Sequence, residues 1–339
     1  MTAIKDFTIG ETIEGFYAAL NIEERDFKDV SKGRFLSLEL RDKTGEASAK
    51  WWDWGKSDLT LADIPLGTII KVRGRVEEYR NQKQVVIGKM RLALPEEYNP
   101  ADFIPTSSQS EEQIIERIDA LRKQVSDPFI TALIDSFFND EETFAAYMRA
   151  SAAERNHHAF VRGLAEHSCN VTEMVLSIAE HYQHLNQDLL IFGGLFHDYG
   201  KIQSYNINTT IQYSLEGRLV DHISLADAEI AARAQTIENF PPNLLLRIRH
   251  LILSHHGIRE YGSPVEPKTP EAILLNYADI IDSRMEMVRT GREVIDTGGW
   301  AYVKPLRKNI YYGPMEPDMP ADSDSGSDAD SDTYSETEQ

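Results

Sequence analysis

The chain has 339 residues, of which 41% are hydrophobic, so it is long enough for two domains with ordinary apolar cores. Its single cysteine, Cys169, excludes an internal disulfide, and no run approaches the roughly 20 apolar residues of a membrane span, so we expect a cytoplasmic protein that does not cross a membrane. The net charge of −20 does not exclude nucleic acid as a partner. Nine acidic residues and no Lys or Arg lie beyond residue 315, whereas residues 1–100 contain 16 basic and 17 acidic residues.

The first part of the chain has the pattern of short β-strands. Strands are predicted at residues 11–20, 33–42, 46–52, 67–76 and 84–87. Residues 33–42 alternate polar and apolar side chains, which is typical of a half-buried strand. Five strands joined by hairpin turns in under 100 residues predict a small β-barrel, most simply an OB-fold over residues 1–97.

Three tryptophans, Trp51, Trp52 and Trp54, lie among basic residues in this predicted barrel, and Arg73 lies on a later strand. Bases stack on aromatic rings and phosphates pair with cations, so this combination predicts a surface that binds single-stranded nucleic acid. Trp51 and Trp52 are adjacent in a strand and must point to opposite faces, so one of the two is expected in the core. A purely structural role for the tryptophans stays open.

The rest of the chain divides into a linker, a helical domain and a tail. Residues 98–112 contain Pro, Ser and Glu and are predicted to be a linker. Residues 113–314 show helical periodicity and are predicted to form an all-helical domain. Residues 315–339 are rich in Asp and Ser with almost no apolar side chains, so we predict a disordered acidic tail.

An apolar run at residues 189–196 leads into His197 and Asp198, and Lys201 follows three residues later. An imidazole beside a carboxylate suits a divalent metal ion, although a capping aspartate beside a core histidine has the same pattern. Other apolar helical segments carry groups of the same kind: His167, His222, His255 with His256, and Asp279. One ligand group per helix is how a helical bundle builds a metal centre.

These motifs resemble a known family. The order His … His-Asp … Asp, with His-Asp-x-x-Lys in the middle, resembles the HD-domain metal-dependent phosphohydrolases. Segments 157–167, 195–201, 213–223, 253–257 and 262–279 together are similar to the YhaM-type 3′–5′ exoribonucleases, in which an OB-fold precedes the HD domain. The resemblance covers about residues 10–310 and not the acidic tail.

The resemblance implies a metal-dependent 3′–5′ exonuclease that hydrolyses single-stranded RNA to nucleoside 5′-monophosphates. It implies one divalent ion held by His167, His197, Asp198 and Asp279, and a second held by Asp198, His222 and His255, His256 or both. We expect manganese, with Mg, Co, Ni or Fe as other candidates. Asp198 and Lys201 are the expected catalytic residues. The expected substrate contacts are His157, His158, Arg162, Arg218, the three tryptophans and Arg73.

Two other interpretations remain open from the sequence. The first is an HD phosphohydrolase that acts on nucleotides or a dinucleotide messenger. The second is a non-catalytic single-strand-binding protein with a structural metal. Single-stranded DNA as a further substrate and oligomerisation also stay open.

Overall fold

The computed structural model describes residues 2–79, 82–155, 157–292 and 299–313. The acidic tail predicted at residues 315–339 lies outside the described residues. The chain divides into two compact units, residues 1–286 and 287–339.

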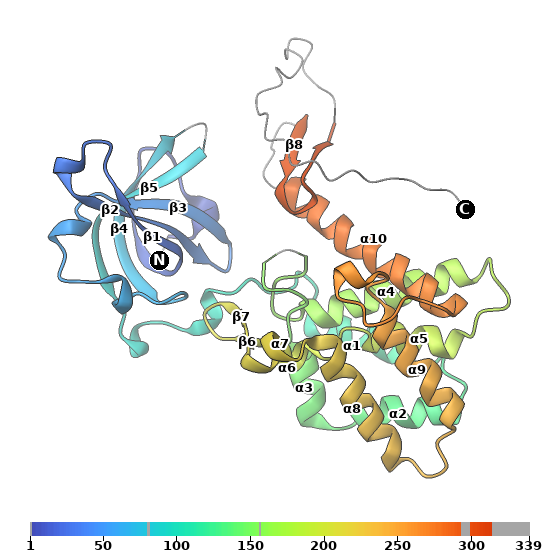
Figure 1. Ribbon diagram of the computed structural model, residues 1–339. Coiled ribbons are helices and arrows are strands. Elements are labelled where there is room, and N and C mark those ends of the chain that lie inside the picture. The colour runs from blue at the N-terminus through green and yellow to red at the C-terminus, as the bar shows by residue number, and fades with distance from the viewer. Residues whose placement is uncertain (1, 80–81, 156, 293–298, 314–339) are drawn as a thin grey trace. The chain divides into compact units, whose positions relative to one another are not determined.

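Residues 12–92 form a closed five-stranded barrel with the strand order β1-β2-β3-β5-β4 (Figure 1). The strands are β1 (Thr12–Asp26), β2 (Arg34–Asp42), β3 (Gly45–Trp51), β4 (Ile69–Tyr79) and β5 (Gln82–Leu92). Neighbouring strands are antiparallel except β3 and β5, which pair in parallel. Leu36, Leu38 and Leu40 of β2 point into the barrel core, as the alternation in the sequence predicts. The predicted OB-type barrel is confirmed.

The domain that follows is mainly helical. Its helices are α1 (Glu111–Arg122), α2 (Pro128–Phe138), α3 (Glu141–Arg149), α4 (Gly163–Ala179), α5 (Gln187–Phe196), α6 (Lys201–Ser204), α7 (Leu215–Leu219), α8 (His222–Thr236), α9 (Pro242–Ser254) and α10 (Pro270–Arg292). Ser110 and Asp127 cap α1 and α2 by accepting hydrogen bonds from backbone N–H groups of the first helical turn. None of the described helices is long and apolar enough to cross a membrane.

Two hairpins interrupt the region that was predicted to be all-helical. They are β6 (Tyr205–Ile207) with β7 (Ile211–Tyr213), and β8 (Trp300–Val303) with β9 (Lys308–Tyr311). Strands of three or four residues are too short for an alternating pattern to stand out, which is why the sequence did not predict them.

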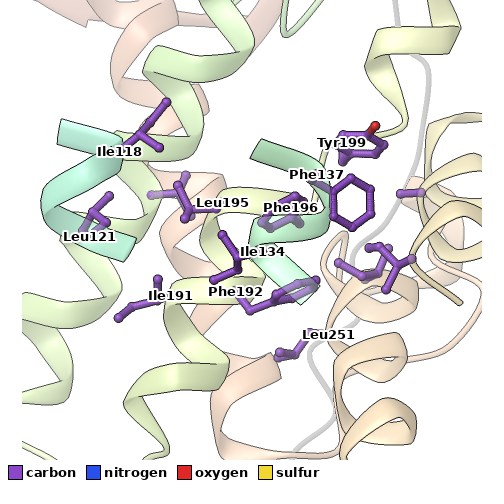
Figure 2. Close-up of a cluster of buried hydrophobic side chains, with 14 of the residues drawn as sticks. Ile118, Leu121, Ile134, Phe137, Ile191, Phe192, Leu195, Phe196, Tyr199 and Leu251 are labelled. Carbon is purple, nitrogen blue, oxygen red and sulfur yellow. The ribbon is translucent and has the colours of Figure 1, made fainter. Parts of the chain in front are cut away.

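Helix α5 lies at the centre of the helical core and packs against α2, α4 and α9. Its Phe192 and Phe196 rings are fully buried and stacked, with centroids 4.6 Å apart, and Phe137 of α2 contacts Phe196 at 5.0 Å (Figure 2). Helix α5 ends immediately before the His-Asp pair. The packing of these aromatic rings therefore fixes the position of His197 and Asp198.

Candidate functional site

The first cluster of polar side chains joins His167 of α4, His197 directly after α5 and Asp279 of α10. The Nε2 atom of His167 lies 3.1 Å from Nε2 of His197 and 3.2 Å from Oδ1 of Asp279. Oδ2 of Asp198 lies 3.4 Å from each of the two Nε2 atoms. Side chains from α4, from α10 and from the two residues that follow α5 therefore aim their ligand atoms at one point.

Asp198 also belongs to a second cluster, with His222, His255 and His256. Its Oδ1 atom lies 3.3 Å from Nε2 of His222 and 3.5 Å from Nε2 of His255. The two oxygens of one carboxylate thus face two different groups of imidazoles. The structure brings together every residue predicted as a metal ligand, and their role as ligands stays a prediction.

Among the described residues, three buried atoms of the second cluster have no hydrogen-bond partner: Oδ1 of Asp198, Nε2 of His222 and Nε2 of His255. A buried polar atom without a partner is costly, so three such atoms at one point favour a ligand that satisfies them together. Imidazole nitrogens and a carboxylate oxygen without a thiolate suit a divalent first-row metal ion. The residues present therefore fit a divalent cation.

Each histidine of the two clusters has its Nδ1 atom within hydrogen-bond distance of an oxygen atom on the side away from the cluster. His197, His255 and His256 place Nδ1 at 2.7–3.0 Å from backbone carbonyl oxygens. His222 places Nδ1 2.5 Å from the Asp221 carboxylate. A carbonyl oxygen accepts only from an N–H group, so Nδ1 carries the proton and the lone pair of Nε2 faces the cluster.

Burial favours the neutral form of the histidines in the second cluster. Desolvation lowers the pKa of His222 and of His255, and it lowers the pKa of His256 to about 4, aided by the neighbouring His255. These imidazoles are therefore neutral near pH 7. Only a neutral imidazole offers a lone pair to a metal ion.

Asp282 is a residue of the site that sequence reasoning missed. Its Oδ2 accepts hydrogen bonds from Nδ1 of His167 at 2.7 Å and Nε2 of His158 at 2.8 Å, and its Oδ1 accepts one from Asn170. Burial lowers the pKa of His167, but hydrogen bonds to the surrounding carboxylates raise it well above its ordinary value. The spacing of Asp279 and Asp282, three residues apart on one helix, was the available signal.

His158 was predicted to contact substrate, and its surroundings correct that prediction. Its side chain is only 2% exposed and Nε2 is bonded to Asp282 behind His167. In this position the His158 side chain contacts Asp282, which in turn contacts His167, and it is too buried to contact a substrate. His157, by contrast, lies with its ring centroid 6.0 Å from that of His167, and burial lowers its pKa to about 3. The Nδ1 atom of His157 is buried and has no hydrogen-bond partner among the residues that the structure describes.

Lys201 is buried, and its Nζ donates to Oδ2 of Asp198 at 2.6 Å. Burial would raise the pKa of Asp198, but Lys201 and His197 hold it well below its ordinary range. Lys201 therefore keeps Asp198 ionised, in addition to any contact with a phosphate. Arg162 precedes α4, and its buried Nε has no hydrogen-bond partner among the described residues. Arg218 is exposed with its guanidinium over a tyrosine ring.

The barrel separates the three tryptophans, which corrects the prediction that all three contact substrate. Trp51 is 7% exposed and Trp54 is 5% exposed, and their rings pack together with centroids 5.7 Å apart in the barrel core. Trp52 is 42% exposed. The expectation that one residue of the Trp51–Trp52 pair would be core is confirmed, and only Trp52 can present its ring to a base.

Trp52 lies in an aromatic group that the sequence did not reveal. Its ring centroid is 4.7 Å from that of Phe35 in β2 and 5.6 Å from that of Phe27 in the loop before β2. Nζ of Lys50 lies 5.7 Å from the Phe35 ring centroid. We call Phe27, Phe35, Trp52 and Lys50 the aromatic platform. The other predicted contact on the barrel, Arg73, is exposed on β4.

Comparison with known proteins agrees with both parts of the fold. Two family models match, an HD domain at residues 164–284 and an OB-fold nucleic acid binding domain at residues 20–93. The chain is 35% identical over 294 residues to the 3′-5′ exoribonuclease YhaM of Oceanobacillus iheyensis, with 86% of this chain and 90% of the relative covered. It is 33% identical over 310 residues to the 3′-5′ exoribonuclease YhaM of Bacillus subtilis, with 90% and 96% covered. The similarity therefore spans both the barrel and the helical domain.

Proposed function

We infer that this chain, which belongs to the YhaM family of 3′–5′ exoribonucleases, is itself a metal-dependent hydrolase that shortens single-stranded RNA from its 3′ end. Each cycle hydrolyses the last phosphodiester bond and releases a nucleoside 5′-monophosphate. The two clusters that share Asp198 are the proposed catalytic centre, and the barrel is the proposed strand-binding module.

The division of Asp198 between the two clusters is the observation that supports this proposal most. It suits two divalent ions, with manganese as our first choice and Mg, Co, Ni or Fe as alternatives. When bound, such ions polarise the phosphate and provide a water-derived nucleophile near neutral pH. The neutral imidazoles of the second cluster would hold an ion with Nε2, and Lys201 keeps the Asp198 carboxylate ionised and fixed in place.

The remaining polar residues are the proposed contacts to the strand. His157 is close enough to the first cluster to bind the terminal nucleotide, and Arg162 and Arg218 are proposed to bind phosphates. The aromatic platform stacks bases further along the strand, and Arg73 adds a contact to the backbone. Stacking does not read the sugar, so single-stranded DNA is a second candidate substrate.

An end-labelled RNA assay tests the proposal. We expect the full chain with Mn²⁺ to shorten 5′-labelled single-stranded RNA one nucleotide at a time and to release labelled 5′-monophosphate at once from 3′-labelled RNA. A chelator should stop the reaction, and added Mn²⁺ should restore it.

Each alternative gives a different result in the same assay. Single-stranded DNA, duplex RNA and dinucleotides serve as comparison substrates. Cleavage of dinucleotides with no preference for longer strands would support the nucleotide phosphohydrolase interpretation. Binding without any metal-dependent cleavage would support the non-catalytic interpretation. Either result would contradict the proposed function.

The exposed tryptophan provides a test of strand binding. We expect Trp52→Ala to weaken the binding of single-stranded RNA by about 10-fold, because stacking of a base on an aromatic ring contributes about 1–3 kcal/mol. Fluorescence anisotropy of a labelled oligonucleotide measures this affinity. Hydrolysis of a small phosphodiester should be unchanged, since a small substrate has no further bases to stack on the platform. Tyr182→Ala, which removes another exposed ring, is the matched control. An equal loss on both substrates would show that the platform is not a strand-binding surface.

A further inference from the structure

Asp221, the residue before His222, has a backbone conformation that is unusual for a residue with a side chain. Its φ is 68° and its ψ is 152°, a region that essentially only glycine adopts without strain. The carbonyl oxygen of His222 is pressed against Gly200, so the backbone here has little room to relax. Such strain persists only where the surroundings enforce it, and it is concentrated at functional sites.

The side chain of Asp221 explains why a residue other than glycine is found there. Its Oδ1 lies 2.6 Å from the backbone N–H of His222 and 2.5 Å from Nδ1 of the same residue. The carboxylate is the acceptor in both hydrogen bonds. Nε2 of His222 then carries the lone pair. This atom is buried, has no hydrogen-bond partner in the part of the chain that the structure describes, and lies 3.3 Å from Oδ1 of Asp198.

The position of His222 on its helix explains why it needs a side-chain acceptor. His197 and His255 each follow the last turn of a helix, and each places Nδ1 against the carbonyl oxygen three residues before it. His222 is the first residue of α8, so no earlier turn of its own helix supplies such a carbonyl. Asp221 supplies the missing acceptor.

We propose that Asp221 is a positioning residue for the metal centre: its carboxylate fixes the tautomer and orientation of His222, and this role maintains a strained backbone that glycine would relieve. The inference rests on the proposed binding of a second divalent ion. It is specific to the second cluster, because Asp221 bonds to His222 and to no ligand of the first cluster among its described hydrogen bonds.

Three substitutions separate the roles of the carboxylate and of the backbone. Asp221→Gly and Asp221→Ala both remove the acceptor, whereas Asp221→Asn keeps an acceptor oxygen without the charge. The side chain is 55% exposed, so none of these changes opens a cavity in the core. Calorimetric titration with Mn²⁺ measures the binding of the metal alone. We expect the Gly and Ala variants to weaken the second equivalent by about 10–100-fold, as for other residues that orient a ligand histidine. The affinity for the first equivalent of Mn²⁺ should be unchanged in all three variants. Asp221→Asn should retain most of the affinity for the second equivalent.

Thermal unfolding in the presence of a chelator measures the effect of the backbone strain at residue 221 without a contribution from bound metal. The Gly and Ala variants lack the same hydrogen bonds and differ only in the Cβ atom, so any difference between them reports on the backbone. We expect Asp221→Gly to unfold about 2–4 °C above Asp221→Ala. Wild-type affinity for the second equivalent in both variants would overturn the positioning role, and equal unfolding temperatures would overturn the strain. If the wild-type protein itself binds a single equivalent, the proposed two-ion function fails instead, which is a distinguishable outcome.

Discussion

Replacing Asp198 by asparagine is expected to lower the rate of metal-dependent RNA hydrolysis by about 10³-fold or more. The two oxygens of this carboxylate face the two clusters, so the substitution removes a negatively charged ligand from both at once. An amide nitrogen in place of one oxygen also points N–H groups at imidazole nitrogens that need a cation. Single-turnover hydrolysis of labelled RNA, with calorimetric titration of Mn²⁺, measures the two consequences separately.

The controls for this variant address the buried lysine beside it. Lys201 loses its partner in Asp198→Asn, and an unpaired buried charge can destabilise the fold. The double variant Asp198→Asn/Lys201→Met removes that charge as well, so it should be folded and equally inactive. Asp135→Asn makes the same chemical change at an ion pair on the surface of α2 and should be fully active. Turnover near the wild-type rate in a folded Asp198 variant would refute the shared catalytic centre.

Gly200→Ala is expected to lower turnover by about 100-fold, because small displacements of catalytic groups have effects of this size. A Cβ at Gly200 would approach Ala226 N to 2.8 Å and the carbonyl oxygen of His222 more closely still. Backbone atoms cannot rotate away, so the start of α8 must shift and carry His222 away from Asp198. Overpacking of this kind also costs about 1–3 kcal/mol of stability.

The signature of Gly200→Ala is a selective loss at the second cluster. We expect the second equivalent of Mn²⁺ to bind more weakly while the first is retained, since the first cluster does not depend on α8. Gly88→Ala is the matched control, because a Cβ there would meet its nearest neighbour at an ordinary 3.6 Å. A folded Gly200→Ala protein with normal metal binding and normal turnover would show that contact between α6 and α8 does not position His222.

The sequence contained enough to predict the barrel and the grouping of the site residues. The alternation in β2 identified the barrel face directly. The predicted ligand residues could be grouped because each is a polar residue in an apolar helical segment, where burial is costly unless the side chain is paired or bound to a ligand. The division into two clusters around Asp198 came from family resemblance, because spacing alone does not fix how helices cross.

The features that were missed depend on three-dimensional packing. Trp54 lies in a short turn after β3 that folds back onto the core, so strand alternation could not predict its burial. Phe27 and Phe35 join Trp52 only after the barrel closes. The bond between Asp282 and His167 links residues more than 100 positions apart, and only the meeting of α4 and α10 reveals it.

Asp198 offers a single negative charge to both clusters, and this sharing has a consequence for how the centre fills. If each cluster binds a divalent ion as proposed, the first ion would withdraw electron density from the shared carboxylate, so the second ion would meet a weaker ligand. The two affinities would then be linked by a coupling free energy that is equal in both directions. Loading would be stepwise, and full activity would require the metal concentration set by the weaker position. One bridging side chain would thus make RNA turnover respond to the supply of free metal ions.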